Sequence, residues 1–243
     1  MGETALVLIP GAGMSSWIWE RVEGKFLVPA IDIPDRFDVN NYPMRKHGML
    51  NDCVEHIRGV LDRTEYRRFI VVGHSGAGPI AAKVASTLKE RVVHVVYVAA
   101  NLPAHGKTML DSLPWMVRMM NLIAIRKMVK RDSMPYKRVE KIVREKFCND
   151  SAEDVIALML SKQMRSEPLC AITERMDWEG FPDVPQTYFV LTRDQTGTVE
   201  RQKTMAGNLK IKNLVEIASD HMVMLSHPEE FVRELNVIAR QYL

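Results

Sequence analysis

The chain contains 243 residues, enough for one α/β domain with a substantial buried core. Its composition, with 47% hydrophobic and 26% charged residues, is ordinary for a globular protein and argues against a disordered or fibrous chain. The formal net charge of +3 is too small to indicate nucleic acid binding, and no apolar run approaches the length of a transmembrane helix.

Apolar, β-branched segments alternate along the chain with segments of helical periodicity, without an internal repeat. This alternation predicts a doubly wound, mostly parallel sheet with helices, in a single α/β domain spanning residues 1–243. The predicted strands lie near residues 4–9, 27–32, 68–73, 92–98, 186–191 and 212–217, and the predicted helices near 16–25, 49–62, 77–89, 198–208 and 228–242.

The first predicted strand ends at Pro10-Gly11-Ala12-Gly13. The glycines of this loop let the backbone approach an oxygen atom of a substrate closely. A phosphate-binding loop is the competing interpretation of glycines after a first strand. We consider it weak, because the loop has neither the G-x-G-x-x-G pattern nor the lysine of a Walker motif.

A hydrophobic strand at residues 69–72 runs into Gly73-His74-Ser75-Gly76-Ala77-Gly78 and then into a predicted helix. This is the G-x-S-x-G pattern, whose glycines avoid collisions across a strained turn and hold the serine hydroxyl clear of the sheet. We therefore predict that Ser75 is a catalytic nucleophile, and the alternative is a plain strand-to-helix turn. Its oxyanion donors are then the backbone N–H groups of Gly76 and of Ala12 in the first loop.

A serine hydroxyl is a weak nucleophile at neutral pH, so the chain must also supply a base. Hydrolases with this turn order their triad as Ser, then Asp or Glu, then His. His221 follows the last predicted strand on a loop at its carboxyl end, where open parallel sheets place their chemistry. The second late histidine, His227, is interpreted as the entry residue of the final helix and is kept as an alternative base.

Asp194 is the predicted acid of the triad, because it directly follows the strand at residues 186–191. Asp220 adjoins His221 in sequence, and neighbouring side chains on an extended loop diverge. Asp177 and Asp183 precede the strand and would lie at its wrong end. The alternative for Asp194 is an ordinary surface position on its loop.

Residues 103–180 form a long insert between the fourth and fifth of these strands, helical in pattern and poor in strands, which we predict to be a cap over the serine. The insert has an apolar face that is rich in methionine. This face could pack the cap onto the core or, because methionine side chains are flexible, line an adaptable pocket for an acyl or aromatic group. A basic stretch in the same insert is interspersed with acids and is interpreted as a solvated helix face. The candidate pocket residues are Trp115, Met116 and Met119 of the cap, with Met14 and Met222.

Four segments together resemble the α/β-hydrolase superfamily over nearly the whole chain: residues 10–19, residues 73–78, Thr192-Arg193-Asp194 followed by Gln202, and Ser219-Asp220-His221-Met222. Within it the chain is most similar to the branch that contains plant methyl esterases, hydroxynitrile lyases and many bacterial carboxylesterases. The resemblance implies the α/β-hydrolase fold, with the helical cap inserted after the strand that follows the nucleophile helix.

The chain departs from that family pattern at several positions. Pro10 stands where the oxyanion motif usually has a histidine, which leaves the donors intact. Met14 stands where plant methyl esterases tend to carry a further histidine, so their substrates are not implied. Hydroxynitrile lyases of this branch carry a threonine and a lysine where this chain has Gly11 and Met222. A lyase that expels cyanide benefits from a cation, and Met222 supplies none.

These features predict a serine hydrolase that cleaves a small to medium carboxylic ester through an acyl-enzyme, using Ser75, His221 and Asp194 and no metal or cofactor. Lactone, thioester and carbon–carbon bond cleavage are compatible with the same triad. The alternative from another class is a non-catalytic ligand-binding protein on this scaffold. The intact order of serine, aspartate and histidine argues against it.

The three cysteines, Cys53, Cys148 and Cys170, show no metal-binding spacing and cannot all pair, which favours a reducing compartment. The first predicted strand begins almost at once, and no secretory signal precedes it. We therefore expect a cytoplasmic enzyme whose partner is a small-molecule ester or related acyl substrate, with no nucleic acid partner and no membrane span. A homodimer is compatible with these features.

Overall fold

Six parallel strands form the sheet in the described part of the chain, in the spatial order β2-β1-β3-β4-β5-β6. The computed structural model describes residues 3–33, 50–112, 115–116, 119, 136–162 and 173–243. Every neighbouring pair is parallel, so the doubly wound sheet predicted from the alternating pattern is confirmed. The strands are β1 (Thr4–Ile9), β2 (Ala30–Asp32), β3 (Arg68–His74), β4 (Val92–Val98), β5 (Gln186–Leu191) and β6 (Asn213–Ile217).

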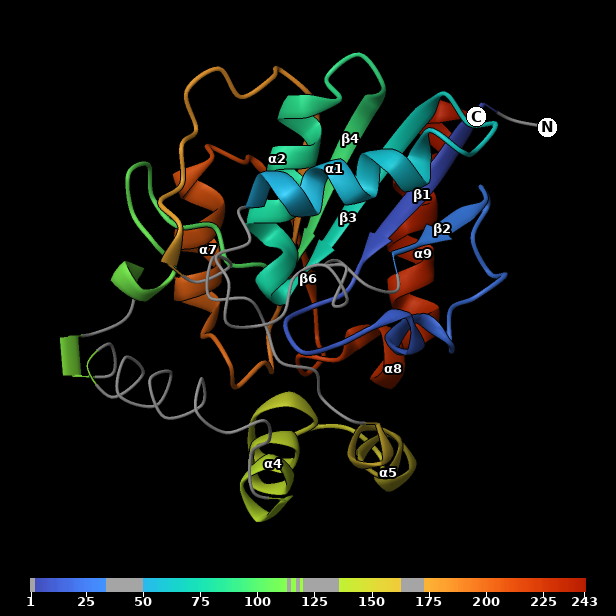
Figure 1. Cartoon of the computed structure of the whole chain (residues 1–243). Helices are drawn as coiled ribbons and strands as arrows, with labels where there is room; N and C mark the ends of the chain where they lie inside the picture. The colour runs from blue at the N-terminus through green and yellow to red at the C-terminus, as the bar shows by residue number, and fades with distance from the viewer. Residues whose placement is uncertain (1–2, 34–49, 113–114, 117–118, 120–135, 163–172) are drawn as a thin grey trace.

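Helices α1 (Leu50–Leu61), α2 (Gly78–Thr87) and α7 (Val199–Asn208) cover one face of the sheet (Figure 1). Their apolar side chains share a core with one set of alternating strand residues, among them Val7 and Val71. Because successive strand residues point to opposite faces, Leu6 and Val72 belong to the core of the other face.

That other face is covered by helix α9 (Pro228–Ala239), the four-residue helix α8 (Val223–Ser226) and the 3-10 helix η1 (Ser16–Trp19). Phe231 of α9 packs against Trp19 and Phe189, with ring centroids 6.2 Å apart in both pairs. The chain ends in the 3-10 helix η5 (Arg240–Tyr242).

The prediction of a helix over residues 16–25 is wrong beyond its first turn. Only Ser16–Trp19 is helical, and the chain then turns through hydrogen bonds such as that from the Val22 N–H to the Trp19 carbonyl. Gly24 adopts a left-handed φ of 69°, which a continuing right-handed helix does not allow. The segment therefore joins the first strand to β2 as a series of turns.

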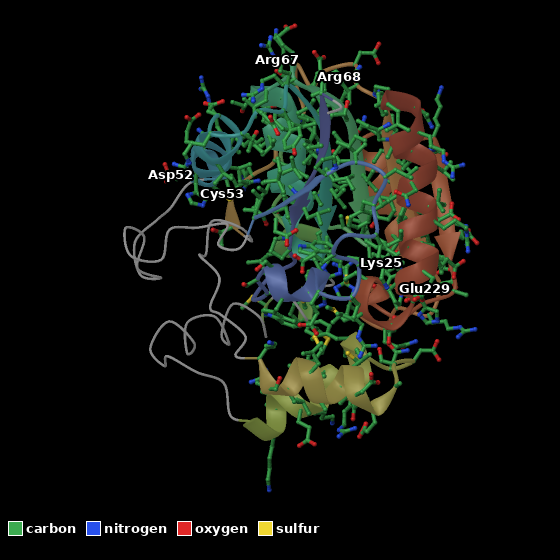
Figure 2. The ribbon with its side chains drawn as sticks, turned by 90° about the vertical axis from the view of Figure 1, so that its right-hand side faces the viewer. Lys25, Asp52, Cys53, Arg67, Arg68 and Glu229 are labelled. Carbon is green, nitrogen blue, oxygen red and sulfur yellow. The ribbon has the colours of Figure 1, made fainter. Side chains whose placement is uncertain are left out.

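The insert between β4 and β5 contains the 3-10 helix η3 (Leu110–Ser112), helix α4 (Tyr136–Ile142), the π-helix η4 (Val143–Phe147) and helix α5 (Glu153–Ser161). Two views place α4 and α5 beyond the end of the sheet that faces away from Arg67 and Arg68 (Figures 1 and 2). Arg68 begins β3, so α4 and α5 lie beyond the carboxyl ends of the strands. Apolar residues of this insert, including Val143 and Met159, join the core that contains Phe189.

Candidate active site

The loops that carry the predicted functional residues all leave the same edge of the sheet. Strand β1 ends at Ile9, β3 at His74, β5 at Leu191 and β6 at Ile217. The carboxyl ends of parallel strands lie together, and ligands of open α/β sheets bind outside them. The fold therefore gathers the four predicted loops at the edge of the sheet beyond which α4 and α5 lie.

Ser75 lies in a sharp turn between β3 and helix α2. Its φ is 51°, in the left-handed region that side chains other than glycine rarely adopt. A Cβ atom at Gly73 would lie 2.7 Å from the Cβ of Ala81, so glycine is required for the strand and helix to approach this closely. A strained serine on a strand-to-helix turn is the local geometry of a nucleophile elbow.

The loop after β1 contacts this serine turn directly. A Cβ atom at Gly76 would lie 2.9 Å from the Cβ and 3.3 Å from the backbone nitrogen of Ala12. A Cβ atom at Gly11 would lie 3.2 Å from the Cβ of Ser75. Gly13 has a φ of 73°, a conformation that glycine adopts without strain. The two residues assigned as oxyanion donors, Ala12 and Gly76, are thus on touching segments beside Ser75.

Asp194 and His221 form a buried hydrogen-bonded pair. The Nδ1 atom of His221 lies 2.7 Å from Oδ2 of Asp194, and the two side chains are 2% and 1% exposed. Because an ionised carboxylate only accepts hydrogen bonds, Nδ1 donates its proton to Asp194, and in the neutral form of the ring Nε2 then carries the lone pair. This tautomer is the one in which a histidine can remove a proton through Nε2.

Thr196 completes the surroundings of the acid. Its backbone N–H donates to Oδ1 of Asp194 at 2.6 Å, and its hydroxyl oxygen lies 3.0 Å from Nδ1 of His221. Burial raises the pKa of Asp194, but the charge of His221 and the hydrogen bonds from His221 and Thr196 outweigh burial and hold that pKa below its usual range. Asp194 therefore remains a carboxylate. Thr196 is not among the residues predicted from the sequence, although the Asp-x-Thr spacing is compatible with an Asx turn.

Two aromatic side chains hold the imidazole of His221. The ring of His74 lies 4.7 Å from it, centroid to centroid, and the ring of Phe147 stacks on it at 5.4 Å with an interplanar angle of 22°. Nε2 of His74 lies 3.0 Å from the backbone oxygen of His221, so Nε2–H donates to that carbonyl. His74 directly precedes Ser75, and it therefore links the serine turn to the histidine loop. No local sequence signal identifies either contact.

The alternative residues have other positions or other partners in the structure. His227 precedes the first residue of α9 and its carbonyl accepts the Phe231 N–H, as its interpretation as a helix-entry residue expected. Asp177 and Asp183 are exposed and precede β5. Asp220 is fully buried and accepts hydrogen bonds from the backbone N–H of Met222 and from the Ser226 hydroxyl.

The candidate pocket residues fall into two groups. Met14 is 5% exposed and Met222 is fully buried, and both belong to the core on the α9 face of the sheet. Trp115, Met116 and Met119 of the cap are 74%, 61% and 49% exposed. Four other apolar residues of the insert and four of its basic residues lie outside the described residues: Leu113, Met120, Leu122, Ile123, Arg126, Lys127, Lys130 and Arg131. A pocket built from these residues stays a prediction.

The described residues contain no group of three or more His, Cys, Asp or Glu side chains placed to hold a metal ion. Within the same residues, none of the helices has both the length and the apolar character that crossing a bilayer requires. Cys53 and Cys148 are both buried, and Cys170 lies outside the described residues.

Comparison with known proteins gives consistent results. The sequence profile described as "Alpha/beta hydrolase family" matches residues 6–234. The rice esterase PIR7B (Oryza sativa subsp. japonica) is 28% identical over an alignment of 257 positions, which spans 97% of this chain and 96% of the rice protein. An extracellular alpha/beta-hydrolase from a Paenibacillus species has a TM-score of 0.79 at 18% identity, covering 96% of this chain and 97% of that one. The methylesterase MES16 from Arabidopsis has a TM-score of 0.72 at 16% identity, covering 99% and 100%.

Proposed function

The chain belongs to the alpha/beta hydrolase family, and from this premise we propose that it is a serine esterase that cleaves a small to medium carboxylic ester. The observation that carries the proposal is the buried pair of Asp194 and His221, 2.7 Å apart, at the edge of the sheet where Ser75 lies in its strained turn. The esterase name of the rice relative, aligned over 97% of this chain, supports the same reaction class.

In the proposed first step, Nε2 of His221 takes the proton of the Ser75 hydroxyl as its oxygen attacks the acyl carbon of the ester. The carbonyl electron pair moves onto the oxygen, and the N–H groups of Ala12 and Gly76 stabilise this oxyanion. Collapse of the intermediate breaks the ester bond, and the imidazolium returns its proton to the departing alcohol. The product of this step is an acyl-enzyme at Ser75.

Water completes the reaction through the same groups. His221 removes a proton from water, the hydroxide attacks the acyl carbon, and Ser75 leaves with the proton that the imidazolium returns. Asp194 stays ionised throughout, orients the imidazole through Nδ1 and stabilises its charged form. The low pKa of Asp194 fits this role, since a protonated acid could not accept the Nδ1–H.

Hydrolysis fits the surroundings of His221 better than cyanide elimination does. Met222 follows the histidine directly and is fully buried among apolar side chains, so it brings no positive charge to stabilise a leaving anion. Gly11 also leaves the oxyanion loop free of a side chain. Both residues are compatible with open oxyanion donors, which an ester carbonyl needs.

The test of the proposal is the Ser75→Ala variant with a short-chain nitrophenyl ester. Loss of the hydroxyl should lower kcat/KM by about a thousandfold or more, because no other group supplies the nucleophile. The matched control is Ser86→Ala, which removes a hydroxyl of an exposed residue of helix α2 that donates to the Ala82 carbonyl. It should leave turnover unchanged.

Intact-mass spectrometry supplies an independent readout. A fluorophosphonate should add once to the wild-type protein and to Ser86→Ala, and peptide mapping should place the adduct on Ser75. Full ester turnover by Ser75→Ala, or labelling at another residue, would reject the proposed nucleophile.

A further inference from the structure

A short stretch of the predicted cap binds the loop that carries Asp194. This stretch, residues 147–151, is named the cap segment here, and it starts at the last residue of the π-helix η4. The side-chain amide of Asn149 donates to the backbone oxygen of Arg193 at 2.9 Å, and the Arg193 guanidinium donates to Oδ2 of Asp150 at 2.5 Å. Arg193 directly precedes Asp194, so the cap segment is attached to the acid loop.

Asp220 attaches the same cap segment to the loop of His221. Oδ2 of Asp220 accepts the Asp150 N–H at 3.2 Å and the Ser151 hydroxyl at 2.5 Å, both from the cap segment. Oδ1 accepts the Met222 N–H at 3.1 Å and the Ser226 hydroxyl at 2.9 Å, both from the histidine loop and helix α8. One carboxylate thus joins two parts of the chain that are distant in sequence.

The burial of Asp220 makes its hydrogen bonds to the cap segment and the histidine loop energetically important. The residue is fully buried, and a buried carboxylate is costly unless hydrogen bonds replace its water. Both donors to Oδ2 come from the cap segment, so displacement of that segment would leave the oxygen without them. The charge of Asp220 therefore favours the position in which the cap segment donates both hydrogen bonds to Oδ2. We call this the seated position of the cap segment.

The seated cap segment also fixes the imidazole. Phe147, the first residue of the segment, stacks on the ring of His221. At the same time, Oδ1 of Asp220 holds the N–H of Met222, the peptide group that directly follows His221. The position of the aromatic ring over the base and the backbone path of the base therefore depend on the same carboxylate.

We propose that Asp220 is a positioning residue that couples seating of the cap segment to orientation of the His221 imidazole. This inference rests on the proposed function, because the orientation of His221 affects catalysis only if this residue is the base. Asp220 itself does not touch the substrate. Its effect on the reaction passes through Ser151 and Asp150 on one side and through Met222 on the other.

The test uses Ser151→Ala, which removes one cap donor, and Asp220→Asn, which removes the charge and keeps the shape. The measured quantity is kcat per serine titrated with a fluorophosphonate, so that unfolded protein does not contribute. We expect kcat to fall about tenfold in Ser151→Ala and further in Asp220→Asn, with KM within about twofold of wild type. Ser151→Thr keeps the hydroxyl and should restore kcat.

The matched control is Ser161→Ala on helix α5 of the cap, since the Ser161 hydroxyl donates to the Leu158 carbonyl and not to Asp220. It should retain wild-type kcat. Unchanged kcat in Ser151→Ala and Asp220→Asn with a lower melting temperature would show that Asp220 serves stability alone, and would overturn the inference. A loss that Ser161→Ala shares, or that Ser151→Thr fails to rescue, would also overturn it.

Failure of the proposed function has a different signature. If wild-type protein is not labelled by the fluorophosphonate and Ser75→Ala keeps its turnover, the serine mechanism is rejected and the positioning role with it. If wild-type protein is labelled on Ser75 and Asp220→Asn behaves as wild type, only the positioning role is rejected.

Discussion

Each end of the parallel sheet holds a buried histidine, in different chemical surroundings. At the carboxyl end, His221 lies 2.7 Å from the carboxylate of Asp194. At the amino end, on the side of Arg68 in Figure 2, His94 lies between two hydroxyl groups, 2.8 Å from that of Thr187 and 3.0 Å from that of Tyr242. Both imidazoles make hydrogen bonds, but only His221 has a negative charge beside it.

The partner decides what a buried imidazole can do. Burial lowers the pKa of His94 from 6.5 to about 4, because neutral hydroxyls do not compensate the lost hydration of an imidazolium. His94 is therefore neutral near pH 7 and serves as a fixed link between strands. A carboxylate favours the imidazolium that forms when a base takes a proton, so the surroundings of His221 suit a proton-transfer role.

The other residues at the two ends of the sheet also differ in their surroundings. At the amino end, the Tyr242 carbonyl accepts hydrogen bonds from Thr4 and Arg68, both at 2.9 Å, and Asn213 donates to Thr187 at 2.7 Å. These bonds tie the end of the chain to strands from across the sheet. At the carboxyl end, Ser75 is held in a strained backbone conformation. Hydrogen bonds across the sheet hold the amino end, and the carboxyl end carries the proposed catalytic residues.

The largest expected effect is on kcat/KM, which should respond very differently to substitution of His221 and of His94. His221→Ala should lower kcat/KM by roughly four orders of magnitude, because triad members act as a unit. His94→Gln should keep kcat per titrated serine within about twofold and lower the free energy of unfolding by about 1–2 kcal/mol.

His227→Ala should mostly reduce stability at the start of α9. A kinetic collapse in His227→Ala equal to that in His221→Ala would break the assignment of the base.

The next effect is the acid sensitivity of the amino end. The folded-state pKa of His94 is lower than the unfolded value of 6.5, so below pH 6.5 the unfolded chain takes up the proton first. Stability is therefore full above about pH 6.5 and falls by about 3 kcal/mol as the pH drops to about 4. Urea unfolding at several pH values measures it, and His94→Gln should lack this part of the loss. Identical pH dependence in the two proteins would contradict the role of His94.

A smaller effect tests how tightly the carboxyl end is packed. A Cβ atom at Gly11 would lie 2.7 Å from Nδ1 of His74 and 3.2 Å from Cβ of Ser75, so Gly11→Ala must displace the serine turn. We expect kcat/KM to fall about ten- to a hundredfold. Gly59→Ala in helix α1 is the matched control, since among the described residues its new Cβ meets no atom within 4 Å outside its own helix. That control should keep wild-type activity and gain about 0.5–1 kcal/mol of stability. Equal activity of both variants would show that the oxyanion loop tolerates a side chain.

The smallest expected effect concerns Asp32, at the carboxyl end of β2. Burial, followed by the charge of Glu23, raises its pKa to about 6. Stability is therefore greatest below the unfolded value of 3.8 and falls as the pH rises through 6. Because the residue is partly exposed to solvent, Asp32→Asn should stabilise the protein at pH 7 by less than about 1 kcal/mol. The gain should vanish at pH 3.5, and a gain of equal size at both pH values would point to a cause other than charge.

The sequence predicted the strands better than the short helices. Runs such as Val92–Val98 are rich in valine, with His94 and Tyr97 as the exceptions, and such β-branched runs are typical of a strand buried on both faces. The segment after Ser16 has helical apolar spacing, yet Gly24 and the short path to β2 turn it after one helical turn. Helix α8 is four residues long, too short for its periodicity to be recognised.

The sequence by itself determined the alternation of strands and helices and the residues at the ends of the strands, including Ser75, Asp194 and His221. These features are local, because apolar spacing and turn residues act over a few positions, and parallel crossovers then gather the strand ends at one edge. Only the tertiary structure decided that Phe147 stacks on His221 and that Asp220 binds the cap segment. Such contacts join side chains about seventy residues apart, and a local pattern carries no information about which distant side chains meet in the packed interior.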